Sequence, residues 1–65
     1  GHRGEEEPLA FYLGERRIPV MEVIDRWLSP DSRYFKVQVY DGSVYILRHH
    51  EAADEWDMTL FSQRP

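Results

Sequence analysis

The chain contains no cysteine, which excludes disulfide bonds, thiolate metal sites and catalysis by a thiol. It also has no apolar run approaching the roughly 20 residues needed to span a membrane, and nothing in it is typical of a signal peptide. The lack of disulfides suits a reducing compartment. We therefore expect a soluble cytoplasmic domain with no membrane association.

Basic residues are few: eight Lys and Arg stand against twelve Asp and Glu, for a formal net charge of −4. The acidity lies near the ends, since residues 49–65 hold four acidic side chains and one arginine, whereas residues 15–48 hold six basic and five acidic ones. Phosphates repel an acidic protein. The charge balance therefore disfavours nucleic acid as a partner.

Asp41-Gly42, between two runs rich in β-branched and aromatic residues, is the strongest hairpin signal in the chain. The dipeptide predicts a two-residue type I′ turn, with positive φ at both positions. In that register Tyr40 faces Ser43 and Val37 faces Ile46. One face of the hairpin is then apolar and consists of Phe35, Val37, Val39, Val44 and Ile46.

A second hairpin is predicted at the start of the chain, where a strand over residues 8–13 is followed by Gly14-Glu15. Glycine at the first turn position is typical of a type II′ turn. This turn pairs Phe11 with Ile18 and Leu9 with Val20. A last strand is predicted near the end, where Trp56, Met58 and Leu60 alternate with polar residues.

Residues 16–28 do not keep one alternation: Ile18 and Val20 have one parity, and Met21, Val23 and Trp27 have the other. A phase change within a β-prone stretch indicates a bulge or a sharp bend. A helix over residues 20–28 is the competing interpretation, because its apolar residues also fit helical spacing. The β-branched content and the preceding hairpin favour a strand.

These elements predict an all-β fold of five antiparallel strands in a meander, forming a small SH3-like or partly open barrel. We expect one domain over residues 8–61, a disordered tail over residues 1–7 and a frayed end over residues 62–65. The predicted core consists of Leu9, Phe11, Ile18, Val20, Val23, Phe35, Val37, Val39, Val44, Ile46, Trp56, Met58 and Leu60.

Three segments together resemble a family of short uncharacterised bacterial proteins: RIPVMEVIDRW at 17–27, RYFKV at 33–37 and DGSVYILRH at 41–49. The chain is similar, more distantly, to a small domain of unknown function found beside error-prone-polymerase-related proteins. The matching residues are mostly core and turn residues, so the resemblance implies a shared fold and no particular chemistry. His50 stands where the family pattern has Asp.

Metal-capable donors cluster only around His49 and His50. Adjacent strand residues point to opposite faces, so we expect the two imidazoles not to share a metal. No catalytic motif stands out, and a barrel of this size lacks a substrate cleft. We therefore predict a protein that is not an enzyme and that uses no metal or cofactor.

Two regions are candidate binding surfaces. In the first, Arg26 and Trp27 line a surface; in the alternative, Asp25 accepts hydrogen bonds from the following turn while Trp27 packs against the core. The second is the other face of the central hairpin, where tyrosines and a leucine alternate with polar groups. The candidate binding residues are Arg26, Trp27, Tyr34, Lys36, Tyr40, Tyr45 and Leu47.

Aromatic surfaces of this kind grip apolar peptide side chains or stack single-stranded bases. Because basic neighbours are few, we expect a non-catalytic protein-interaction module with an unidentified protein partner or a second copy as a homodimer. It would bind through the aromatic sheet face or an exposed strand edge. The alternative is a nucleic-acid accessory domain that stacks single-stranded bases on the same face.

Overall fold

The computed structural model describes residues 7–63 and contains five strands in this part of the chain. Their bounds are Ala10–Leu13 (β1), Arg16–Leu28 (β2), Ser32–Val39 (β3), Val44–His50 (β4) and Glu55–Ser62 (β5). Each strand pairs antiparallel with the next in the order β1-β2-β3-β4-β5. Residues 7–63 contain no helix that could span a membrane. The predicted all-β meander is confirmed.

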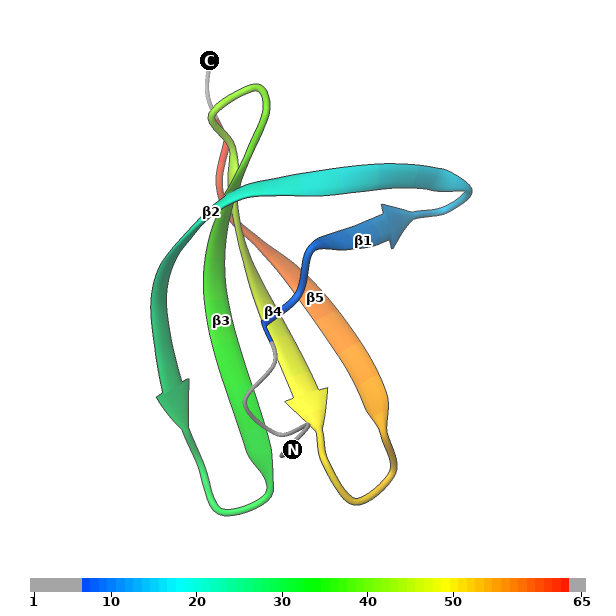
Figure 1. Ribbon diagram of the computed structural model, residues 1–65, viewed down its shortest axis with the longest axis vertical. Coiled ribbons are helices and arrows are strands. Elements are labelled where there is room, and N and C mark those ends of the chain that lie inside the picture. Colours follow the sequence, from blue (N-terminus) through cyan, green and yellow to red (C-terminus); the bar gives the residue numbers. More distant parts are fainter. Residues whose placement is uncertain (1–6, 64–65) are drawn as a thin grey trace.

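The sheet curls into a half-barrel that stays open between β1 and β5 (Figure 1). β2 belongs to both parts of the curled sheet. Its first part pairs with β1, and its second part, from Val20 onward, pairs with β3. The bend in β2 places the β1–β2 hairpin over the concave face of the sheet. There the ring of Phe11 lies 5.0 Å from that of Tyr45.

The register of the first hairpin is the one predicted, with Phe11 opposite Ile18 and Tyr12 opposite Arg17. Gly14 has a φ of 62°, as the first position of a type II′ turn requires. The phase change in β2 is also confirmed. The register with β3 shifts between Val20 and Glu22 and again between Val23 and Asp25, so two bulges bend the strand.

The central hairpin differs from the prediction by one residue. The N–H of Gly42 donates to the carbonyl of Val39 at 2.9 Å, and the N–H of Val39 donates to the carbonyl of Ser43 at 3.0 Å. Gly42 has a φ of 87°, whereas that of Asp41 is not positive. The loop is therefore a three-residue turn that ends in a glycine bulge, not a type I′ turn.

A shift of one residue turns every side chain of a strand to the opposite face. Phe35 now lies opposite Leu47, and Val37 lies opposite Tyr45. The core consists of Phe35, Val37 and Leu47, with Phe11, Val20, Val23 and Tyr45 packed against it. The prediction that Val44 and Ile46 share a face with Phe35 is therefore wrong, and both lie on the outer, convex face.

Two further turns join the remaining strands. The N–H of Ser29 donates to the carbonyl of Ser32 at 2.9 Å, which closes the predicted turn over Pro30-Asp31. The loop from β4 to β5 covers residues 51–54 and ends at Asp54, whose φ is 53°. Aspartate tolerates this left-handed conformation better than most residues.

The core prediction also fails at Leu9, just before β1, and on β5. Leu9 is 81% exposed, and Trp56, Met58 and Leu60 are exposed as well. The parity of β5 is as predicted, since Met58 lies opposite Leu47 and Leu60 lies opposite Tyr45. β5 has no neighbour on its far side, so its three apolar side chains face the core without being covered.

The predicted terminal segments fall mostly outside the described residues. Residues 1–6 and 64–65 are not described. Glu7, at the end of the predicted tail, forms an ion pair with Arg26. Ser62, the first residue of the predicted frayed end, is the last residue of β5.

Candidate functional site

A row of side chains crosses the outer face of the sheet from β2 to β5. Trp27 stacks on Tyr34 with the ring centroids 5.3 Å apart and the planes within 5° of parallel. Tyr34 lies opposite Arg48, and Arg48 lies opposite Asp57. Trp27 is 41% exposed. Of the predicted aromatic face of the central hairpin, only Tyr34 and Lys36 lie on this side, and the aromatic contact found here is the Trp27–Tyr34 stack.

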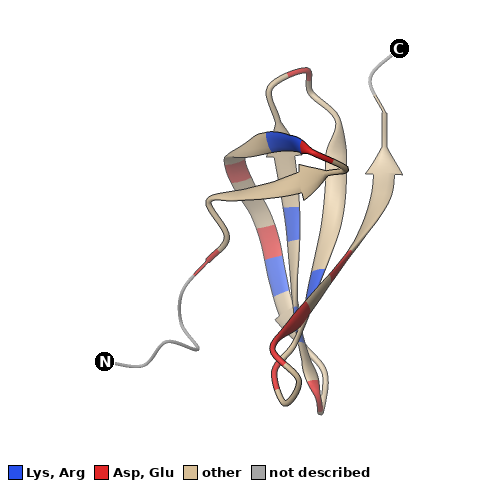
Figure 2. Cartoon of the chain, turned by 90° about the vertical axis from the view of Figure 1, so that its right-hand side faces the viewer, with Lys and Arg blue, Asp and Glu red and all other residues tan. Residues whose placement is uncertain are grey.

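Carboxylates are interspersed with the cations of this outer face. Asp25 lies opposite Lys36, and Glu22 lies opposite Gln38 on the next row of the same face. The ammonium of Lys36 lies 4.0 Å from the centre of the Phe61 ring. Figure 2 shows that acidic and basic residues alternate along parts of the strands.

The other predicted binding residues do not join this face. Arg26 lies opposite Phe35 on the concave side and pairs with Glu7. Tyr40 is in the turn, where its hydroxyl accepts a hydrogen bond from Arg16 at 3.3 Å. Tyr45 packs against the core, and Leu47 is 2% exposed. Leu47 therefore belongs to the core and not to a surface.

The prediction that Asp25 accepts hydrogen bonds from the following turn is wrong. Its Oδ1 accepts from the backbone N–H of Arg26 at 2.8 Å. The following turn is instead held by Asp31, whose Oδ1 accepts from the hydroxyls of Ser29 and Ser32 at 3.4 and 3.3 Å. Trp27 lies on the outer face, where it stacks on Tyr34, and does not pack against the core.

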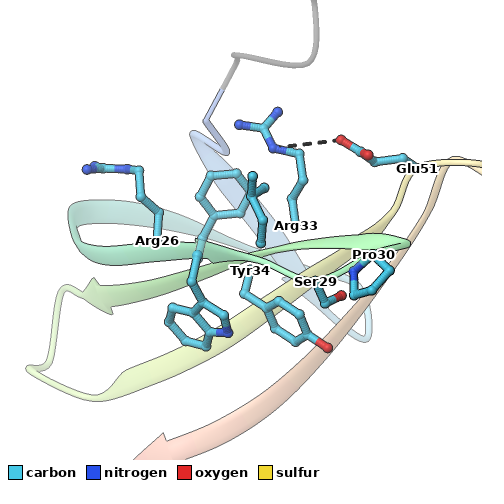
Figure 3. A pocket seen from close by; sticks show the side chains of 9 residues that line it. Arg26, Ser29, Pro30, Arg33, Tyr34 and Glu51 are labelled. Atoms are coloured by element: carbon cyan, nitrogen blue, oxygen red, sulfur yellow. Dashed lines mark ion pairs between the residues drawn. The ribbon is translucent and has the colours of Figure 1, made fainter.

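A depression of about 630 Å³ lies at the end of the β2–β3 hairpin. Figure 3 shows Arg26 and Arg33 on one side of the ribbon and Tyr34 on the other. Arg33 lies 3.8 Å from Glu51, and its guanidinium carbon is 5.4 Å from the centre of the Phe35 ring. Because its lining is divided between two faces, the depression does not form one concave site.

Histidine, serine and carboxylate groups meet where β3, β4 and β5 lie side by side. Nδ1 of His50 lies 3.4 Å from the Ser32 hydroxyl, and Nε2 lies 2.8 Å from Oδ2 of Asp57. A serine nucleophile must reach its substrate, but Ser32 is buried. The contacts of His50 with Ser32 and Asp57 therefore link β3, β4 and β5 through their side chains.

His49 lies on the opposite side of β4 from His50. Its ring stacks on Trp56 with centroids 4.4 Å apart, and its Nε2 is 2.9 Å from Oδ1 of Asp54. The two imidazoles thus have different carboxylate partners. Among the described residues, no group of three or more histidine, aspartate or glutamate side chains is arranged to hold a metal ion.

Asp57 is the carboxylate at the centre of the outer network. Hydrogen bonds from Arg48 and His50 hold the pKa of Asp57 below its usual value, and Asp57 raises the pKa of Arg48. A carboxyl with a lowered pKa stabilises the fold above its unfolded pKa of about 4, and this contribution is lost as the pH falls through the folded pKa.

We predict that Arg48→Gln raises the pKa of Asp57, because the largest cause of its lowering is the hydrogen bond from Arg48. Carbon-13 NMR of the Asp57 carboxyl during an acid titration measures this pKa. Lys36→Gln is the matched control, since it removes a cation from the same face without touching the network. Equal titration midpoints in the two variants would contradict the assignment.

The far side of β5 is an unpaired edge of the sheet, as is the far side of the second part of β2. The N–H of Ser29 bonds to β3, and the N–H of Val39 bonds to β4. Main-chain groups alternate in direction along a strand, so these two bonds set the alternation across the sheet. It follows that Glu55, Asp57 and Thr59 bond to β4, whereas the main-chain groups of Trp56, Met58 and Leu60 point to the open edge.

An apolar groove of about 400 Å³ lies beside this edge. It lies at the opening of the half-barrel between β1 and β5. Its lining comes from both strands and from the core between them: Pro8, Ala10, Phe11, Tyr12, Leu47, Trp56, Asp57 and Met58. Unpaired main-chain groups and half-exposed apolar side chains are therefore found at the same place.

Trp56, Met58 and Leu60 were assigned to the core from the sequence and not to a site. One signal was available: the last strand of an open meander is necessarily an edge, and β5 has neither Pro nor Lys to protect it. Such protection is usual at natural edges. The apolar alternation of β5 alone did not distinguish a covered strand from an uncovered one.

Comparison with protein-family models found no match, and neither did comparison with curated proteins or with solved structures.

Proposed function

We propose that this protein is a non-catalytic protein-interaction module that binds an extended segment of its partner as an additional strand along β5. The observation that carries the proposal is the free edge at Trp56, Met58 and Leu60, where unpaired main-chain groups accompany exposed apolar side chains. In strand addition, main-chain hydrogen bonds supply affinity and alternate side chains supply specificity.

The free edges of the sheet differ in how they are protected. The second part of β2 has two bulges, which twist an edge away from an incoming strand. β1 has only four residues, follows Pro8 and pairs with a segment that contains Pro19. Short length and proline are common ways to block unwanted pairing. β5 has eight residues and no proline, and its acidic residues, Glu55 and Asp57, lie opposite His50 and Arg48 on the outer face. The edge with the least protection is therefore β5, whose single bulge lies near its end.

The Trp27–Tyr34 stack supports the alternative of a nucleic-acid accessory domain, because aromatic rings on a sheet stack single-stranded bases. The surrounding charges favour a protein partner. Arg48 is paired with Asp57, and Asp25 lies beside Lys36. A phosphate backbone placed on this face would meet carboxylates as well as cations.

Met58→Pro tests the proposal, because proline removes an N–H from the open edge and obstructs an incoming strand. Met58 does not use that N–H to bond β4, so we expect a native circular-dichroism spectrum. Displayed random peptides selected on the original chain should bind the variant at least about tenfold more weakly, a loss of about 1.4 kcal/mol.

Trp27→Ala is the control for the outer face, and we expect it to bind the same peptides as tightly as the original chain does. Selected peptides that bind Met58→Pro unchanged would contradict the use of the edge. A single-stranded oligonucleotide whose binding depends on Trp27 and not on Met58 would instead support the nucleic-acid alternative.

A further inference from the structure

Resting on this proposed function, we infer that the strand accepted by β5 is β5 of a second copy of the chain. The two copies would form a symmetric dimer, with the strands antiparallel and Met58 at the two-fold axis. Two-fold dimers use the same surface patch on both subunits, which must therefore be complementary to itself. The edge of β5 meets this requirement in its main chain, its side chains and its charges.

The main-chain groups fit one register. Trp56, Met58 and Leu60 direct their N–H and C=O groups outward, and they are evenly spaced about Met58. With Met58 opposite Met58 of the second copy, Trp56 lies opposite Leu60 and Leu60 opposite Trp56. Every outward-directed residue then meets another, and each pair exchanges two bonds, about six in total. The Phe61 bulge ends this pairing after Leu60.

The side chains fit the same register. On the concave face the facing pairs are Trp56 with Leu60 and Met58 with Met58, which are all apolar. Aromatic and aliphatic pairs directly across two strands stabilise a sheet. On the outer face Asp57 lies opposite Thr59 of the second copy. No two carboxylates are placed directly opposite one another within the paired segment.

Charge does not prevent two acidic copies from meeting at this edge. Asp57 is bonded by Arg48 and His50, Asp54 by His49, and Glu51 lies near Arg33. All the acidic residues around β5 except Glu55 thus have cationic or hydrogen-bonding partners within their own chain (Figure 2). What remains open along the edge is mainly apolar, which favours a second copy over a strongly basic strand.

Analytical ultracentrifugation tests the association. Between about 10 µM and about 1 mM, a range that covers weak interfaces, we expect the mass to rise from the 7.8 kDa monomer toward twice that value. Met58→Pro should stay at 7.8 kDa throughout. An original chain that remains monomeric over this range would overturn the inference.

Cysteine cross-linking tests the register, because the chain has no cysteine of its own. Met58→Cys places two thiols across the axis, within the Cα separation of 4.4–6.8 Å that a disulfide accepts. With oxidised glutathione as oxidant, we expect a covalent dimer to form at least about tenfold faster than for Met21→Cys, whose site on β2 is 66% exposed. Equal rates would contradict the register.

The outcomes separate this inference from the function on which it rests. A monomeric chain that still selects peptides in a Met58-dependent manner would overturn the dimer and leave strand addition in place. A monomeric chain with no Met58-dependent peptide would overturn both. A dimer that Met58→Pro does not dissociate would place the contact between copies elsewhere on the molecule, against this inference.

Discussion

Phe35→Ala is expected to remove most of the stability of the domain. Phe35 is 1% exposed and lies at the centre of the core with Val37 and Leu47. Replacing such a residue by alanine costs about 3–5 kcal/mol, whereas whole domains are stable by about 5–15 kcal/mol and small ones lie at the low end. Urea unfolding followed by tryptophan fluorescence measures the loss.

Leu28→Ala is the control for that measurement. Leu28 is 74% exposed on β2, so its truncation should change the free energy of unfolding by no more than about 0.5 kcal/mol. Losses of similar size for the two variants would show that Phe35 does not occupy the centre of the core. A cooperative transition in the control is required for the comparison.

Leu47→Ala and Ile46→Ala should differ strongly although the residues are neighbours on β4. In the observed register Leu47 is buried against Phe35, and Ile46 lies on the outer face opposite Lys36. We expect Leu47→Ala to cost about 2–5 kcal/mol and Ile46→Ala about 1 kcal/mol. The same urea titration measures both.

This pair of variants tests the loop as well as the core. A type I′ turn at Asp41-Gly42 would place Ile46 in the core and Leu47 outside. The order of the two losses would then be reversed. Larger destabilisation by Ile46→Ala than by Leu47→Ala would therefore contradict the three-residue loop and restore the register predicted from the sequence.

Much of the candidate site could not be predicted from local sequence patterns. The outer face keeps Trp27, Tyr34 and Lys36 from the predicted set. The parity of β3 is as predicted, whereas Trp27 does not share a face with Val23, because the bulge between Val23 and Asp25 changes the parity of β2. Tyr45 and Leu47 were placed on the wrong face because their parity depended on the turn. The edge residues of β5 were assigned to the core because an apolar alternation does not reveal whether another strand covers it.

The sequence alone determined the elements and their order. Turn residues such as Gly14 and Pro30, and the phase change within residues 16–28, are local signals whose effect does not depend on distant contacts. They were enough to establish five antiparallel strands, the first hairpin's register and the bent second strand. Each of these features depends on a few residues that are neighbours in the sequence.

Only the tertiary structure decided which face of β4 is buried and where the barrel opens. Val44, Tyr45, Ile46 and Leu47 are all apolar or aromatic, so alternation gives no preference for either face. A loop longer by one residue, together with the packing of Leu47 under the β1–β2 hairpin, settles the choice. The free edge of β5 follows in the same way, because whether two strands meet depends on the curvature of the whole sheet.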